Sequence, residues 1–153
     1  MSSSSSTELM PAEFSTVEYN TSGQIIGTIN ALSFGAIAPD YSGSTRIIRL
    51  ESKHSITRFI SLKLGIVGAT IQGFPISQVY TIGHNESFDP SFVPTEFFPD
   101  VNTTNTVEDV NNVAVGLSLD LKGSDYVYLS SHLPSRYLGS GECVYRWFFT
   151  YED

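Results

Sequence analysis

The sequence predicts a single all-β domain, an antiparallel β-sandwich of the immunoglobulin-like or jelly-roll type. Several short segments alternate apolar and polar residues, which is the pattern of strands with one buried face. Clusters of Gly, Asn, Asp, Ser and Pro separate these segments, and almost no window has a helical period. The length of 153 residues fits one hydrophobic core. We therefore expect a sandwich over residues 13–153 with one long loop at 83–112.

An extended N-terminal arm, residues 1–12, precedes the predicted domain. It contains five consecutive serines and no periodic pattern. Polar terminal segments bury little surface and are usually poorly ordered unless something holds them. We expect a free arm that becomes ordered against something outside this chain.

Two segments show the strand alternation most clearly. Every odd residue from Val113 to Leu121 is apolar. In the second segment the even positions are apolar except at Arg58, and they are Ile56, Ile60, Leu62, Leu64 and Ile66. Further β-rich runs bring the expected total to seven or eight strands, with 14–19, 24–34, 45–50, 78–82, 126–129 and 143–151 as the other candidates. Glycine-containing turns are predicted at 40–43, 122–125 and 138–141.

The last predicted strand, Cys143–Tyr151, is aromatic on both faces, which is typical of a central strand or of one covered by a neighbouring molecule. We expect Trp147 in the core rather than on a ligand platform, because aromatic side chains dominate cores. Cys143, the only cysteine, is expected to be a small buried residue.

The predicted loop 83–112 interleaves prolines with four phenylalanines. Each proline lacks a backbone donor and favours an extended residue before it, so neither a helix nor a central strand fits well. A short helical turn at 106–110 is a further prediction. Loops of this length are usually functional. Two interpretations of the aromatic side chains stay open, packing on the domain's own core or contact with another subunit, and the residues concerned are Phe88, Phe92, Phe97 and Phe98.

The charge of −8, from eight basic and sixteen acidic residues, disfavours nucleic acid and anionic lipid as partners. Five of the eight basic residues lie between positions 46 and 63. They either dock on the acidic face of another copy, with Arg46 and Arg49 as contacts, or protect two strand edges against unwanted pairing.

Known catalytic motifs are missing from the sequence, and we assign no catalytic residue, cofactor or metal. The histidines His54, His84 and His132 have none of the close spacings of metal ligands. Acidic residues of the loop offer carboxylate pairs, as any acidic loop does. The sequence also lacks an apolar run of the roughly 20 residues that cross a bilayer and the features of a signal peptide, so we expect no membrane association.

Three segments, Ile29–Pro39, Ser42–Leu50 and Ile56–Val67, together resemble the strand, turn, strand, strand passage of immunoglobulin-like β-sandwich modules. The resemblance is greatest to structural proteins of tailed bacteriophage particles and covers about forty residues. It implies a non-enzymatic virion component that decorates the capsid or belongs to the neck, tail or fibres. Its partners would be other virion proteins or copies of itself, and assembly would take place in the host cytoplasm.

The main alternative is a glycan-binding or adhesive module that binds a host-surface sugar. Its platform would be an aromatic ring of Tyr126, Tyr128, Tyr145 or Trp147. A binding platform leaves its rings exposed in the free protein, whereas a core or subunit contact covers them. A third class, a small hydrolase, requires a cleft with converging titratable groups, and the sequence contains no motif for one.

Overall fold

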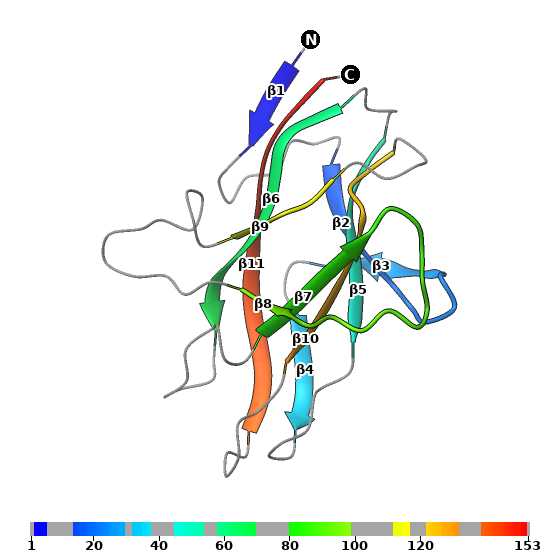
Figure 1. Ribbon diagram of the computed structural model, residues 1–153, viewed down its shortest axis with the longest axis vertical. Coiled ribbons are helices and arrows are strands. Elements are labelled where there is room, and N and C mark those ends of the chain that lie inside the picture. Colours follow the sequence, from blue (N-terminus) through cyan, green and yellow to red (C-terminus); the bar gives the residue numbers. More distant parts are fainter. Residues whose placement is uncertain are drawn as a thin grey trace.

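The structure is a computed structural model that describes residues 2–5, 14–29, 32–37, 45–53, 58–69, 80–98, 112–116, 122–131 and 139–152. The described residues form strands and connecting segments without a helix, and every strand pair is antiparallel. The strands form two sheets (Figure 1). The main cluster of buried side chains contains residues of both sheets. The predicted all-β antiparallel fold is confirmed.

The first sheet has five strands and is built around the long C-terminal strand β11. β11 pairs with β6 along most of its length, and β6 pairs in turn with β9. Two further strands, β1 and β4, pair with opposite ends of β11. The bounds are β1 Ser2–Ser5, β4 Leu32–Ile37, β6 Arg58–Ala69, β9 Asn112–Ala114 and β11 Gly139–Glu152.

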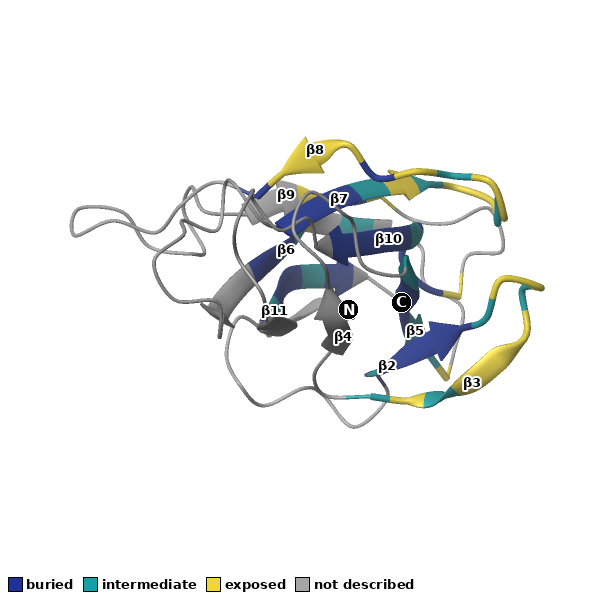
Figure 2. Ribbon diagram, turned by 90° about the horizontal axis from the view of Figure 1, so that it is seen from below, coloured by how far each residue is buried: buried dark blue, intermediate teal, exposed yellow. Residues whose placement is uncertain are grey.

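The second sheet has six strands in the order β3-β2-β5-β10-β7-β8, so that β3 and β8 are its edges. Figure 2 shows these two edges as exposed and most of the strands between them as buried. The bounds are β2 Phe14–Tyr19, β3 Ile25–Thr28, β5 Arg46–Ser52, β7 Tyr80–Asn85, β8 Glu96–Phe97 and β10 Tyr126–Ser131.

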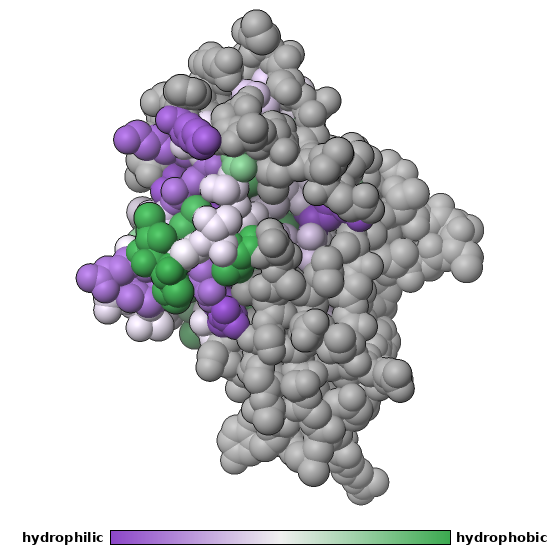
Figure 3. All heavy atoms as spheres, turned by 180° about the vertical axis from the view of Figure 1, so that it is seen from behind, coloured by the Kyte–Doolittle hydropathy of each residue, from purple (hydrophilic) through white to green (hydrophobic). Residues whose placement is uncertain are grey.

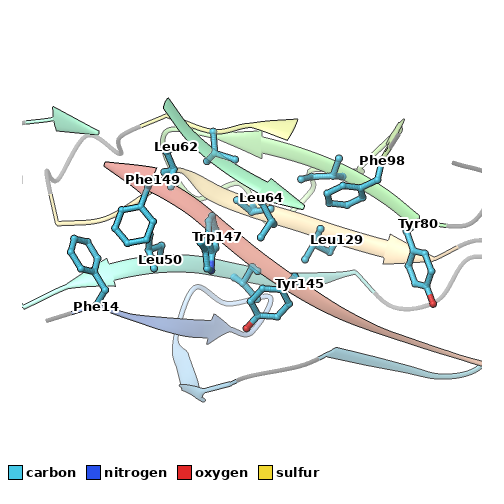
Figure 4. Close-up of a cluster of buried hydrophobic side chains, with 14 of the residues drawn as sticks. Phe14, Leu50, Leu62, Leu64, Tyr80, Phe98, Leu129, Tyr145, Trp147 and Phe149 are labelled. Atoms are coloured by element: carbon cyan, nitrogen blue, oxygen red, sulfur yellow. The ribbon is translucent and has the colours of Figure 1, made fainter. Parts of the chain in front are cut away.

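The core between the sheets follows from the predicted alternation. Leu62 and Leu64 of β6 are buried at even positions, as expected from the sequence. Trp147 of β11 is only 3% exposed, and its Nε1 donates a hydrogen bond to Thr16 Oγ1 of the opposite sheet at 2.9 Å. In Figure 4 the Trp147 side chain lies among core residues of both sheets, including Leu50. The expectation that Trp147 is a core residue is confirmed.

Three sequence predictions of local structure are corrected. The single strand expected at 24–34 is two strands, β3 and β4, which belong to different sheets. The turn expected at 138–141 is wrong from Gly139 onward, because these residues begin β11 and pair with β4 across a bulge. The arm is not free over Ser2–Ser5, which pairs with Phe149–Glu152 of the same chain. Backbone hydrogen bonds to the chain's own last strand hold this part of the arm.

The predicted loop 83–112 begins as strand, because β7 continues to Asn85, and it contains β8, which pairs with β7. The predicted turn at 40–43, the helical turn at 106–110 and the strand residues 117–121 lie outside the described residues, as do His54 and His132.

A bulge bends β6 where it pairs with β11. Ser61 and Leu62 together lie opposite the single residue Phe149, and Ser61 has a φ of 56°. Non-glycine residues rarely adopt this left-handed conformation. The bulge returns Leu62 and Leu64 to the inner face after Phe59, which also packs against the core.

Candidate interaction surface on the six-stranded sheet

The outer face of the six-stranded sheet has its own apolar cluster. Residues at odd positions of β2 and β5 and at even positions of β10 point away from the inter-sheet core, because side chains alternate along each strand. Four of them are buried and three aromatic side chains pack against them, giving the outer cluster of Val17, Tyr19, Ile47 and Tyr128 with Phe88, Phe92 and Tyr126. The outer face of this sheet is therefore partly covered by side chains of the same chain.

Residues 86–93 cover this outer cluster. The ring of Phe92 stacks on the ring of Tyr128 with centroids 4.5 Å apart and planes 21° apart. Gly83 lies directly opposite Tyr128, and a Cβ atom there would lie 2.7 Å from Phe92 Cζ. Only glycine leaves room for the Phe92 ring at this position. Asp89 N–H donates to the Tyr128 hydroxyl at 2.7 Å, which fixes the backbone of the covering segment.

The local turn at Asp89 explains why Phe92 reaches the sheet. Asp89 Oδ1 accepts hydrogen bonds from Ser91 N–H at 3.0 Å and from Ser91 Oγ at 2.8 Å, and Phe92 N–H donates to Asp89 O at 3.3 Å. Asp in this position commonly bonds the backbone two residues on. Pro90 follows with its fixed φ, which suits a turn.

The hydroxyl of Tyr128 has a raised pKa. Burial raises the pKa of its hydroxyl above the usual value, and the negative charges of Asp89 and of an ionised Tyr126 raise it further. The hydrogen bond from Asp89 N–H opposes this by stabilising the phenolate. Burial is the largest of these effects, so Tyr128 stays neutral across the physiological range.

The predicted phenylalanines divide between the two open interpretations. Phe98 is fully buried in the inter-sheet core, and its N–H donates to Tyr80 O at 3.1 Å. Phe88 and Phe92 pack on the outer cluster. Phe97 is different, because its side chain is 40% exposed on the edge strand β8. Three of the four rings therefore pack on the domain itself, and Phe97 alone of the four is substantially exposed.

The two predicted arginine contacts are both engaged within the chain. Arg46 forms a paired contact with Glu18, in which its Nη2 donates to Oε1 at 2.8 Å and its Nε to Oε2. Arg49 is nearly fully buried, its Nε donates to Ser124 O at 3.2 Å, and its guanidinium lies 4.9 Å from the centroid of the Tyr126 ring. Both side chains therefore make contacts that stabilise this sheet.

The exposed large apolar residues lie at or beside the edges of the same sheet. On β3 the side chains of Ile25 and Ile26 are 62% and 61% exposed. At the other edge Phe97 lies on β8, and Val93, which is 70% exposed, precedes it. In Figure 3, hydrophobic residues form a group on one side of the molecule, and hydrophilic residues surround this group. Exposed apolar side chains on edge strands are a recognised template for binding another chain.

The sequence analysis missed Ile25 and Ile26. Two consecutive isoleucines in a strand normally place one side chain on each face, which suggests burial on both. The structure instead has a bulge at this point, since Glu18 pairs with Gly27 and Tyr19 with Ile25, leaving Ile26 extra. One feature of the sequence could have identified this edge: residues 20–29 contain no charged side chain, although the chain as a whole is strongly acidic.

A histidine and an aspartate form a second polar contact near the covering segment. His84 Nδ1 lies 2.9 Å from Asp125 Oδ2, which also accepts the Gly116 N–H at 3.0 Å. Among the described residues, Asp125 Oδ1 is a buried oxygen without a hydrogen-bond partner. The pair connects β7 to the start of β10, and the described residues contain no group of three or more side chains suited to holding a metal ion.

Comparisons with known proteins give no relative for this chain, since no family model, curated protein or solved structure matches it. Within the described residues, no helix has the length and apolar character needed to span a membrane.

Proposed function

We propose that this chain acts by protein–protein assembly, without catalysis, as a structural component of a virus particle. The observation that carries the proposal is the gathering of exposed large apolar side chains at the two edges of the six-stranded sheet, Ile25 and Ile26 on one edge and Phe97 on the other. Exposed apolar residues at sheet edges favour contact with other protein chains.

The burial of the aromatic rings supports assembly over glycan binding. Tyr128, Tyr145 and Trp147 are buried within this chain, and Tyr126 is partly covered by Tyr19, Phe88 and Arg49. A sugar platform needs at least one flat aromatic face in contact with water. The rings that the glycan alternative requires are therefore engaged in packing.

The resemblance of Ile29–Pro39, Ser42–Leu50 and Ile56–Val67 to tailed-bacteriophage sandwich modules supports the choice of a virion among assemblies. Capsid decoration and a place in the neck, tail or fibres are both compatible with that resemblance. The partners are other virion proteins or copies of this chain. The net charge of −8 supports a protein partner rather than the packaged nucleic acid.

The proposal is tested on particles purified from the infected host by density gradient. Mass spectrometry should detect this chain at a constant ratio to the capsid proteins across the particle fractions and after a high-salt wash. A salt wash separates structural subunits from proteins adsorbed by surface charge. Recovery of the chain only from fractions that contain no particles would overturn the virion assignment.

A further inference from the structure

The β3 edge combines three features that do not occur together elsewhere in the described part of the sheet. Ile25 and Ile26 are mostly exposed, and among the described strands β3 pairs only with β2. A Cβ atom added at Gly27 would meet nothing within 4 Å, so the face of β3 toward which it would point is open at this residue.

The backbone of β3 is oriented to accept another strand. Ile29 N–H donates to Thr16 O at 3.0 Å, so the backbone groups of Ile29 point toward β2. Successive residues of an antiparallel strand direct these groups to opposite edges. The N–H and C=O of Thr28 therefore point away from β2, toward the edge that carries the exposed isoleucines.

Charge favours the β3 edge as the place where two copies of this chain can meet. Two copies of a chain with a charge of −8 repel each other over most of their surfaces, but residues 20–29 contain no charged side chain. The nearest acid on β2, Glu18, is buried and paired with Arg46. The β8 edge is less suitable because it contains Glu96 and is flanked by Pro94 and Pro99, which cannot donate to a strand pair.

We propose that β3 of one copy pairs antiparallel with β3 of a second copy, which joins the two six-stranded sheets across a two-fold axis at Gly27. This inference rests on the proposed function, because it names one partner of the assembly. A two-fold axis requires one residue to face itself, and Gly27 fits that position. Its backbone groups point toward β2, so the two Gly27 residues form the non-hydrogen-bonded pair in which strands approach most closely, at about 4.5 Å between Cα atoms.

The proposed register also explains the exposed side chains. With Gly27 on the axis, Ile26 of each copy lies opposite Thr28 of the other, in a hydrogen-bonded pair. Ile25 shares a face with Tyr19, its partner on β2, so the second copy would extend the outer cluster across the new contact. The pairing covers both isoleucines without bringing like charges together.

The first test compares two substitutions at the axis. Gly27→Thr and Gly27→Lys both enter open space and are expected to fold, but only lysine places two like charges directly opposite each other. Sedimentation velocity up to about 0.5 mM should show a monomer–dimer equilibrium for the wild type and for Gly27→Thr. Gly27→Lys should raise the dissociation constant at least about tenfold. A wild type that stays monomeric, or a dimer insensitive to lysine, overturns the proposal.

The second test uses a disulfide to determine whether the two Gly27 residues face each other in the dimer. In a Cys143→Ala background, Gly27→Cys should form an interchain disulfide on mild oxidation, since Cα atoms at about 4.5 Å are within the range of disulfides. The matched control is Thr95→Cys, an exposed residue near the other edge. Crosslinking of Gly27→Cys no faster than the control contradicts the pairing. Both tests use purified chain alone, so their failure leaves the particle experiment, and the virion assignment, standing.

Discussion

Phe92 and Tyr128 stack with their ring centroids 4.5 Å apart, and the glycine at position 83 makes this contact possible. A Cβ atom at Gly83 would lie 2.7 Å from Phe92 Cζ and still closer to Cε1. The stack is therefore a packing contact between the covering segment and the sheet that tolerates no side chain beneath it.

Gly83→Ala is expected to destabilise the protein by about 1–3 kcal/mol, because the Phe92 ring must move to avoid the new methyl group. Urea denaturation followed by fluorescence measures the free energy of unfolding. Gly27→Ala is the matched control, since it adds the same methyl group to a strand in open space. We expect that control to be neutral or slightly stabilising, and equal losses at both glycines would contradict the packing role of Gly83.

The raised pKa of Tyr128 predicts a loss of stability at high pH. A tyrosine whose folded pKa lies above its unfolded value of about 10 keeps its proton longer in the folded state. The associated stability is fully present below pH about 10 and is lost as the pH rises from there through the folded pKa.

Alkaline titration of absorbance at 295 nm, compared between wild type and Tyr128→Phe, should assign one late-titrating phenol to Tyr128. The same substitution should flatten the fall in stability above pH about 10. If the difference titration follows an ordinary tyrosine, the burial of Tyr128 is not maintained in solution.

Sequence alone predicted the sandwich but not the assignment of strands to sheets. The alternation at Leu62 and Leu64 and the aromatic strand around Trp147 identify core positions directly, because burial of one face constrains side-chain type. The residues of β3 and of β4 both favour extended conformations, so their β propensity does not show that the two strands belong to different sheets. The run 24–34 therefore reads as one strand although β3 and β4 are separate.

Sequence analysis also could not predict contacts that are made by backbone hydrogen bonds. Ser2–Ser5 pairs with β11 through main-chain groups that every residue type carries, so no side-chain pattern indicates it. The exposure of Phe97 beside the buried Phe98 depends on where β8 meets β7, which short-range patterns do not encode.

The positive φ of Ser61 predicts that replacing this serine by glycine stabilises the protein. Its φ of 56° costs a side-chain-bearing residue about 1–2 kcal/mol, whereas glycine adopts this conformation freely. Ser61→Gly should therefore raise stability by up to about 1 kcal/mol, after the greater flexibility of glycine in the unfolded chain is subtracted. That gain corresponds to about 2–4 °C in Tm by differential scanning calorimetry.

The control for Ser61→Gly is the reverse change at Gly23, whose φ is 81°. Gly23→Ala should lower Tm, both because alanine is strained there and because its Cβ would lie 3.2 Å from the Phe88 ring. A lower Tm for Ser61→Gly would show that the bulge depends on the serine side chain.

The ion pair of Glu18 and Arg46 lies at the end of the core, since both residues share the inner face with Ile48. Glu18 is buried, so losing its partner leaves a carboxylate with little access to water, whereas Arg46 remains about a quarter exposed. Arg46→Met should therefore destabilise the protein more than Glu18→Gln, by about 3 kcal/mol against about 1–2 kcal/mol. The double variant should recover part of the loss, because it removes the unpaired charge. A double-mutant cycle from urea denaturation measures the coupling, and additive effects of the two substitutions would mean that the pair does not form in solution.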